Sequence, residues 1–114
     1  MPNFMEVRQG DNFNIRLQFK NKQSFVNIKD ALIKMQVRAL DDNRVVFTKT
    51  GEVDDAENGK AHIAIVPADT QDLDLKTSYI TDIQVTFANG EVHTIYPQDV
   101  NKVASFIITQ NVTE

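Results

Sequence analysis

The sequence predicts an all-β fold, namely an immunoglobulin-like sandwich of two antiparallel sheets with about seven to eight strands. Apolar and polar residues alternate in three stretches, Phe13–Phe19, Ala61–Val66 and Tyr79–Phe87. Alternation with a period of two is typical of strands that bury one face. Turn-forming residues separate the apolar stretches roughly every 8–12 residues, the spacing of short strands in a sandwich. A small closed barrel has the same alternation and remains the alternative.

The clearest element is a hairpin over Tyr79–Tyr96. Its first strand, Tyr79–Phe87, is rich in β-branched and aromatic residues. Asn89-Gly90 follows and predicts a type I′ turn, because both residues tolerate a positive φ. Glu91–Ile95 then forms the return strand, which we expect to end at Pro97 because proline cannot donate to the ladder.

Four segments are predicted in the first half of the chain. Phe4–Arg8 predicts a short edge strand, and the polar residues after it predict a turn. Phe13–Phe19 is the most regular strand of the first half. Leu32–Leu40 contains helix-favouring residues, but its apolar and polar residues alternate and the turn formers Asp41-Asp42-Asn43 follow it, so we interpret it as a strand. Val45–Phe47 then returns from that turn and completes a second hairpin.

The remaining segments are a loop, a helical turn and two strands. The acidic stretch Gly51–Gly59 predicts a mobile loop before the strand Ala61–Val66. A proline and several acids then predict one short helical turn near residues 68–74. Residues 97–102 read as a polar connection, and Ser105–Thr109 predicts the last strand.

The alternation also predicts which side chains form the core, provided that no bulge reverses a strand. The predicted core consists of Phe13, Ile15, Leu17, Phe19, Val37, Ile63, Ile65, Tyr79, Ile83, Val85, Phe87, Phe106 and Ile108.

Length and composition predict a single β-sandwich domain over residues 1–114. The net charge of −4 is spread over interspersed acids and bases, so we expect no nucleic-acid or membrane surface. Cysteine is absent, which excludes disulfides and thiolate chemistry. The first residues lack the features of a signal peptide, and we expect synthesis in the cytoplasm.

No residue pattern indicates catalysis or a cofactor. The only two histidines, His62 and His93, are predicted at outward strand positions, without a third ligand beside them. The acidic pairs Asp41-Asp42 and Asp54-Asp55, and the group Asp69, Asp72 and Asp74, lack the spacing of a calcium loop. We interpret them as solvated turns and a helix start. No nucleophile elbow or phosphate-binding loop occurs. The prediction is therefore a protein that is not an enzyme, with no catalytic, metal-binding or cofactor-binding residue and no small-molecule substrate.

Several short motifs, in this order, resemble small β-sandwich virion domains of tailed bacteriophages, such as the N-terminal domain of siphophage upper-baseplate proteins. The match spans nearly the whole chain, and its specificity lies in the order of the motifs. The motifs are Gly10-Asp11-Asn12-Phe13, Val26-Asn27-Ile28, Gln36-Val37-Arg38, Gly59 through Pro67, Tyr79 through Val85, Asn89-Gly90-Glu91-Val92 and Asn111-Val112-Thr113. Asn27 and Pro97-Gln98-Asp99 depart from the pattern, so the resemblance does not indicate which part of the virion is involved.

The resemblance implies a structural or adaptor protein of a tail, baseplate or head fibre, assembled in the host cytoplasm and then present in the virion. Its implied partners are further copies of itself, other virion structural proteins, or both. The alternative is a free-standing immunoglobulin-like binding or regulatory domain made during infection. Because an open sandwich exposes unpaired backbone groups at its edges, we expect Phe4, Met5 and Val7 to contribute to a protein contact.

Overall fold

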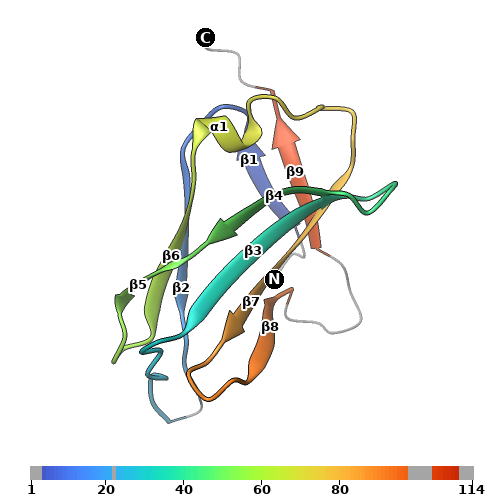
Figure 1. The fold of residues 1–114 in the computed structure, drawn as a ribbon. Helices are drawn as coiled ribbons and strands as arrows, with labels where there is room; N and C mark the ends of the chain where they lie inside the picture. The colour runs from blue at the N-terminus through green and yellow to red at the C-terminus, as the bar shows by residue number, and fades with distance from the viewer. Residues whose placement is uncertain (1–3, 22, 98–103, 111–114) are drawn as a thin grey trace.

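The computed structural model describes residues 4–21, 23–97 and 104–110, and these residues form two β-sheets that face each other (Figure 1). The strands are β1 (Phe4–Arg8), β2 (Phe13–Gln18), β3 (Leu32–Ala39), β4 (Val45–Thr50), β5 (Glu52–Asp55), β6 (Lys60–Ile65), β7 (Tyr79–Thr86), β8 (Val92–Tyr96) and β9 (Ala104–Thr109), and the helix is α1 (Pro67–Thr70). The described residues thus hold nine strands, more than the seven or eight predicted. The short helical turn is present but begins and ends earlier than predicted.

The larger sheet has six strands in the order β1-β9-β7-β3-β4, with β8 also paired to β7. β9 pairs with the first half of β7, at Tyr79–Thr81, and β8 pairs with its second half, at Ile83–Thr86. β1 runs parallel to β9, whereas the other pairs are antiparallel. The prediction of an edge strand at Phe4–Arg8 is therefore confirmed.

The smaller sheet has three antiparallel strands in the order β2-β6-β5. The order β9-β7-β3-β4 facing β2-β6-β5 corresponds to strands G-F-C-C′ facing B-E-D in immunoglobulin-like domains. The fold is therefore an immunoglobulin-like β-sandwich, as the sequence predicts.

A tyrosine at the start of β7 supports this assignment. The hydroxyl of Tyr79 donates to the Asp74 carbonyl at 3.1 Å and accepts from the Asp74 amide at 3.0 Å. This is the tyrosine corner of immunoglobulin-like domains. Thr81 occupies the position two residues later, where antibody domains carry a cysteine. It is buried, and its hydroxyl donates to the Gln36 carbonyl at 2.8 Å.

The core lies between the sheets, and the buried residues of β3, β6, β7 and β9 form most of it. Seven of the predicted core residues are buried as expected: Val37, Ile63, Ile65, Tyr79, Ile83, Val85 and Phe106, each at most 5% exposed, and Ile108 follows at 9%. Leu32–Ala39 is a strand with buried alternate residues, which confirms the interpretation of that segment against its helix propensity.

Five predicted core residues are only partly buried: Phe13, Ile15, Leu17, Phe19 and Phe87. Their parity is right, because each packs against the core, but their predicted depth is wrong. The three in β2 belong to an edge strand, which has a neighbour on one side only. Phe19 and Phe87 follow the ends of β2 and β7 and contact each other edge to face, with ring centroids 6.4 Å apart.

The predicted mobile loop at Gly51–Gly59 is wrong for its first half. Glu52–Asp55 forms β5, which pairs antiparallel with β6. Only the residues between Asp55 and Lys60 form the turn of this hairpin. The acidic side chains of β5 are tolerated because an edge strand exposes them to water, as the exposure of Glu52, Val53 and Asp54 shows.

The hairpin of β7 and β8 is confirmed, and β8 ends before Pro97, but its turn is not type I′. Gly90 has a φ of +93°, whereas Asn89 does not have a positive φ. The Gly90 amide donates to the Phe87 carbonyl at 2.9 Å, and the Phe87 amide donates to the Glu91 carbonyl at 2.8 Å. This is a three-residue loop that ends in a left-handed glycine, the other common hairpin connection.

Candidate protein-interaction surfaces

β1 forms one edge of the six-stranded sheet, and it carries the three residues predicted to contact a partner. Val7 is only 3% exposed and belongs to the core, while Met5 is partly buried against it. The side chain of Phe4 lies outside the part of the structure that is described. Met5 and Val7 therefore face the interior of their own chain, and a partner at this edge would meet the β1 backbone instead. The role of these residues in a contact stays a prediction.

The outward side chains of β1 are charged. Glu6 and Arg8 are both exposed, and as residues i and i+2 of a strand they point to the same face. The end of β1 is held in place by Gln9, whose side-chain amide donates to the carbonyls of Thr70, Gln71 and Leu73 at 3.2, 3.0 and 2.8 Å. This edge is therefore rigidly connected to the loop at α1.

The outer face of the six-stranded sheet carries an apolar group, which we call the apolar cluster: Leu40, Val45, Ile80 and Ile107. Ile80 pairs with Ser105 on β9 and with Arg38 on β3, and Arg38 pairs with Val45 on β4. Leu40 follows Arg38 by two residues, and Ile107 follows Ser105 by two. Diagonal neighbours of this kind lie about 7–8 Å apart, within reach of long side chains.

The apolar cluster is accessible to a partner. Leu40 is 57% exposed, Val45 45% and Ile107 38%, and Ile80 is partly exposed. The Leu40 amide donates to the Ser78 carbonyl at 2.8 Å, so the backbone that presents the cluster is part of the sheet ladder. The sequence contained a signal for it, since Ile80 and Ile107 occupy outward positions of alternating strands, where polar residues are usual.

The outer face of the three-stranded sheet carries a histidine between two carboxylates. Nδ1 of His62 lies 2.9 Å from both carboxylate oxygens of Asp54, and its Nε2 lies 3.7 Å from Oε2 of Glu52. An open depression of about 510 Å³ lies beside it, lined by Asn14, Arg16, Leu17, Gln18, Asp54, Lys60, Ala61 and His62. In some hydrolases a carboxylate orients a histidine that acts as a general base for a nucleophile. Asp54 belongs to β5 and His62 to β6, so this contact connects the two strands.

The two histidines lie in different sheets. His93 belongs to β8 and pairs with Val85, so its position faces the inner side of the sheet and not the predicted outer side, while its side chain is exposed, as predicted. The cause of the inward position is the three-residue loop after Phe87, since a two-residue turn at Asn89-Gly90 would have placed His93 opposite the outward Thr86 instead of the inward Val85. The imidazole of His93 contacts the Phe87 ring, with centroids 5.6 Å apart, and Nε2 lies 3.3 Å from Oε2 of Glu91.

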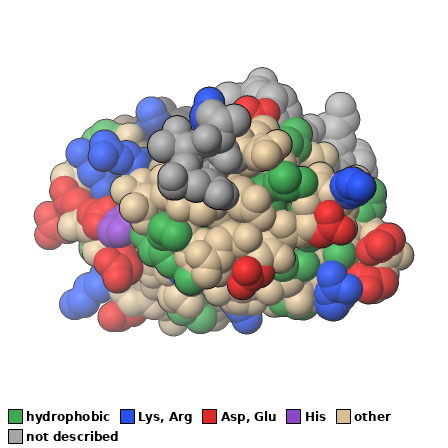
Figure 2. Space-filling model, turned by 90° about the horizontal axis from the view of Figure 1, so that it is seen from above, with side chains coloured by type: hydrophobic (Ala, Val, Ile, Leu, Met, Phe, Trp, Pro, Cys, Tyr) green, Lys and Arg blue, Asp and Glu red, His purple; other side chains and the backbone are tan. Residues whose placement is uncertain are grey.

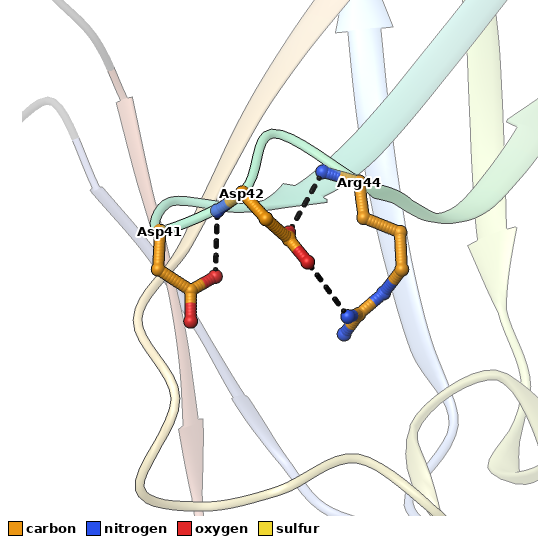
Figure 3. A network of polar contacts seen from close by, with 3 residues as sticks. All are labelled: Asp41, Asp42 and Arg44. Carbon is orange, nitrogen blue, oxygen red and sulfur yellow. Dashed lines mark hydrogen bonds and ion pairs between the residues drawn. The ribbon is translucent and has the colours of Figure 1, made fainter.

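The acidic residues of the turns have structural partners. Oδ1 of Asp41 accepts from the Asp42 amide at 2.8 Å, and Oδ1 of Asp42 accepts from the Arg44 amide at 3.0 Å (Figure 3). The Arg44 guanidinium also reaches Oδ2 of Asp42 at 3.0 Å. Asp69 accepts from the Val66 amide at 2.9 Å and pairs with Lys49 at 3.0 Å. These contacts fit the interpretation of the acids as turn and helix-start residues.

The charge distribution is mixed. Seen from above, the molecule shows acidic and basic side chains interspersed and hydrophobic side chains in small separate areas (Figure 2). Among residues 4–21, 23–97 and 104–110, no three or more His, Asp or Glu side chains form a group suited to a metal ion. The same residues include no helix long and apolar enough to cross a membrane.

No known protein-family model matches the chain, and no curated protein is similar to it in sequence. Among solved structures, murine CRIg is similar at 12% identity and a TM-score of 0.44, covering 95% of this chain and 93% of that one. A VGSC beta subunit, from a study of multimeric cell-adhesive interactions, is similar at 8% identity and a TM-score of 0.39, covering 95% and 90%. Likenesses of this size do not indicate what the present chain binds.

Proposed function

We propose that this chain is a non-enzymatic protein-binding domain that serves as a structural or adaptor component of a tailed-phage virion. The observation that carries the binding function is the apolar cluster on the outer face of the six-stranded sheet. The ordered motifs from Gly10-Asp11 to Asn111-Val112-Thr113 support the virion part of the proposal.

Burial against a partner would stabilise the apolar cluster. Leu40 and Val45 are about half exposed, and their backbone is already ordered, Val45 within β4 and Leu40 through its hydrogen bond to Ser78, so binding would cost little conformational ordering. Removing apolar surface from water is favourable by roughly 25 cal/mol per Å². Apolar groups rimmed by polar residues mark interaction sites on soluble proteins, and here Arg38, Gln36 and Asp82 adjoin the cluster.

The test is incorporation into virions, measured by mass spectrometry of purified particles. The native chain should be present in the particles, and the double variant Leu40→Asp/Val45→Asp should be depleted at least tenfold. Val92→Asp is the matched control, because Val92 is 56% exposed but lies on β8, away from the cluster. Circular dichroism verifies that both variants fold.

Absence of the native chain from particles would reject the virion role, and its recovery with a soluble protein would then favour a free-standing binding domain. Equal incorporation of the double variant and Val92→Asp would reject the apolar cluster as the binding surface.

A further inference from the structure

We infer that two copies of this chain pair along the outer edges of β1, antiparallel and about a two-fold axis at Val7. The two six-stranded sheets would then join into one continuous sheet. This inference rests on the proposed function in taking protein assembly as its mode, but it uses an edge that is separate from the apolar cluster. It also names one partner, which is a second copy of the chain.

Within the part of the chain that the structure describes, β1 pairs with β9 alone, so half of its backbone groups point away from the sheet. The Gln9 amide donates to the Thr109 carbonyl at 2.9 Å, so the backbone groups of Gln9 and Val7 face β9. Alternate residues of a strand point their backbone groups to opposite sides, and those of Glu6 and Arg8 therefore face outward. The Arg8 carbonyl also accepts from the Asp11 amide at 3.2 Å, and a carbonyl has a second lone pair available.

The side chains of β1 make this edge complementary to itself. With a two-fold axis at Val7, Glu6 of one copy lies directly opposite Arg8 of the other, and the symmetry repeats the pair. Residues directly opposite across an antiparallel pair have Cβ atoms about 4.5–5.5 Å apart, and opposite charges there are stabilising. An isologous interface of this kind needs one self-complementary patch, which Glu6 and Arg8 provide.

The other described edges lack this complementarity. β5 presents Glu52 and Asp54, so a second copy would bring like charges together. β4 carries Lys49, which is already paired with Asp69 at 3.0 Å. β2 carries Arg16 as its one charged residue, and β8, which pairs with β7 alone, carries no Asp, Glu, Lys or Arg. Within the described residues, the β1 edge is thus the one on which adjacent opposite charges favour pairing with a second copy.

β1 is also prepared for pairing before a partner arrives. Val7 anchors its middle in the core, and the three hydrogen bonds of Gln9 hold its end. A strand that is already extended loses little conformational freedom on pairing, which favours association. An open strand edge is a template for a further strand, and β1 is short enough that its pairing depends on the two charge pairs.

The test is a charge exchange, with the oligomeric state read by analytical ultracentrifugation. The native chain should form a dimer that dissociates on dilution. Glu6→Arg and Arg8→Glu each place like charges opposite each other, and each should weaken dimerisation at least tenfold. Because both side chains are exposed, circular dichroism should show an unchanged fold.

Mixing the two single variants should restore association, because one chain then carries arginine at both positions and faces glutamate at both positions of the other. The double variant Glu6→Arg/Arg8→Glu should also dimerise by itself. A native chain that stays monomeric at high concentration would overturn the inference, as would single variants that dimerise normally or a mixture that fails to associate. The proposed function would survive these results, since particle incorporation through the apolar cluster is measured separately.

Discussion

β7 lies in the middle of the six-stranded sheet, whereas β2 lies at the edge of the three-stranded sheet. Both strands alternate strictly between inward and outward residues. The inward residues of β7 are buried, with Ile83 at 1% exposure and Val85 at 0%, while those of β2 are all only partly buried. The difference follows from their neighbours, since β7 has strands on both sides and β2 has β6 alone.

Alternation therefore indicates which face of a strand is inward. The number of neighbouring strands decides how deeply the inward residues are buried. The two sheets also have different roles. The six-stranded sheet supplies the most deeply buried strands and both candidate binding surfaces, at the β1 edge and the apolar cluster. The three-stranded sheet closes the core from the other side through β6, whose Ile63 is 0% exposed.

The largest expected effect is that of Ile83→Ala in β7. Loss of a fully buried side chain should lower the free energy of unfolding by about 2–5 kcal/mol, from lost transfer energy and the cavity left behind. Chemical denaturation measures this value. Ile80→Ala, on the same strand but facing outward, is the control and should cost about 1 kcal/mol or less. Equal losses would show that β7 does not have one buried face.

Gly59→Ala tests the close packing of the turn between β5 and β6 against the backbone that follows β2. Gly59 has a φ of +67°, and an added Cβ would overlap the Phe19 carbonyl oxygen and lie 2.8 Å from that of Val26. The backbone must shift, so we expect a loss of about 2–4 kcal/mol in unfolding free energy. Gly90→Ala is the matched control, because Gly90 has a φ of +93° but no atom within 4 Å of the added Cβ. It should cost about 1–2 kcal/mol. A loss from Gly59→Ala no greater than this would contradict the close approach.

Ile15→Ala measures how much less an inward side chain on an edge strand contributes to the free energy of unfolding. Ile15 on β2 lies opposite Ile63 on β6. The two residues have the same side chain in the same sheet and differ in how deeply that side chain is buried. We expect about 1 kcal/mol for Ile15→Ala, because Ile15 is only partly buried and its site at the sheet edge can fill with water, and about 2–5 kcal/mol for Ile63→Ala. Similar losses at the two positions would mean that edge position does not control burial in this sheet.

Local patterns predicted most of the strands. The alternation in Tyr79–Phe87 identified the buried face of β7, and the turn after Leu40 outweighed the helix propensity of the preceding strand. β5 was missed because its stability comes from pairing with β6 and not from its own acidic residues. The irregularity at Ile83 and Gln84 was also missed, since a change of register arises between two strands and leaves no mark in either one.

The candidate surfaces were harder to predict than the strands. The edge position of β1 followed from its sequence, but the inward direction of Val7 depends on its parallel pairing with β9, near the other end of the chain. The apolar cluster combines residues from three regions that are far apart in the sequence: Leu40 and Val45 around the turn between β3 and β4, then Ile80, then Ile107. Its presence depends on sheet order, which no local pattern specifies.

The smallest expected effect concerns the turn between β5 and β6. The side-chain amide of Asn58 donates to Oδ2 of Asp55 at 2.8 Å, and this hydrogen bond, helped by Lys60, holds the pKa of Asp55 below its usual value. A folded-state pKa below the unfolded one adds stability above the unfolded pKa of 3.8, and the gain is lost as the pH falls through the folded pKa. Asn58→Ala should therefore raise the pKa of Asp55, measured by an NMR titration of its carboxyl carbon.

Asn89→Ala is the control in the other sheet. Oδ1 of Asn89 accepts from the Glu91 amide at 2.9 Å in the turn between β7 and β8, so its loss disturbs a comparable turn without touching Asp55. The midpoint of Asp55 should stay unchanged in this variant. The destabilisation by Asn58→Ala should also be smaller at pH 2 than at pH 7. The hydrogen bond from Asn58 is stronger to the charged carboxylate of Asp55 than to the protonated carboxyl group. A loss of stability that is the same at both pH values would instead assign the effect of Asn58 to the conformation of the turn and not to its hydrogen bond with the Asp55 carboxylate.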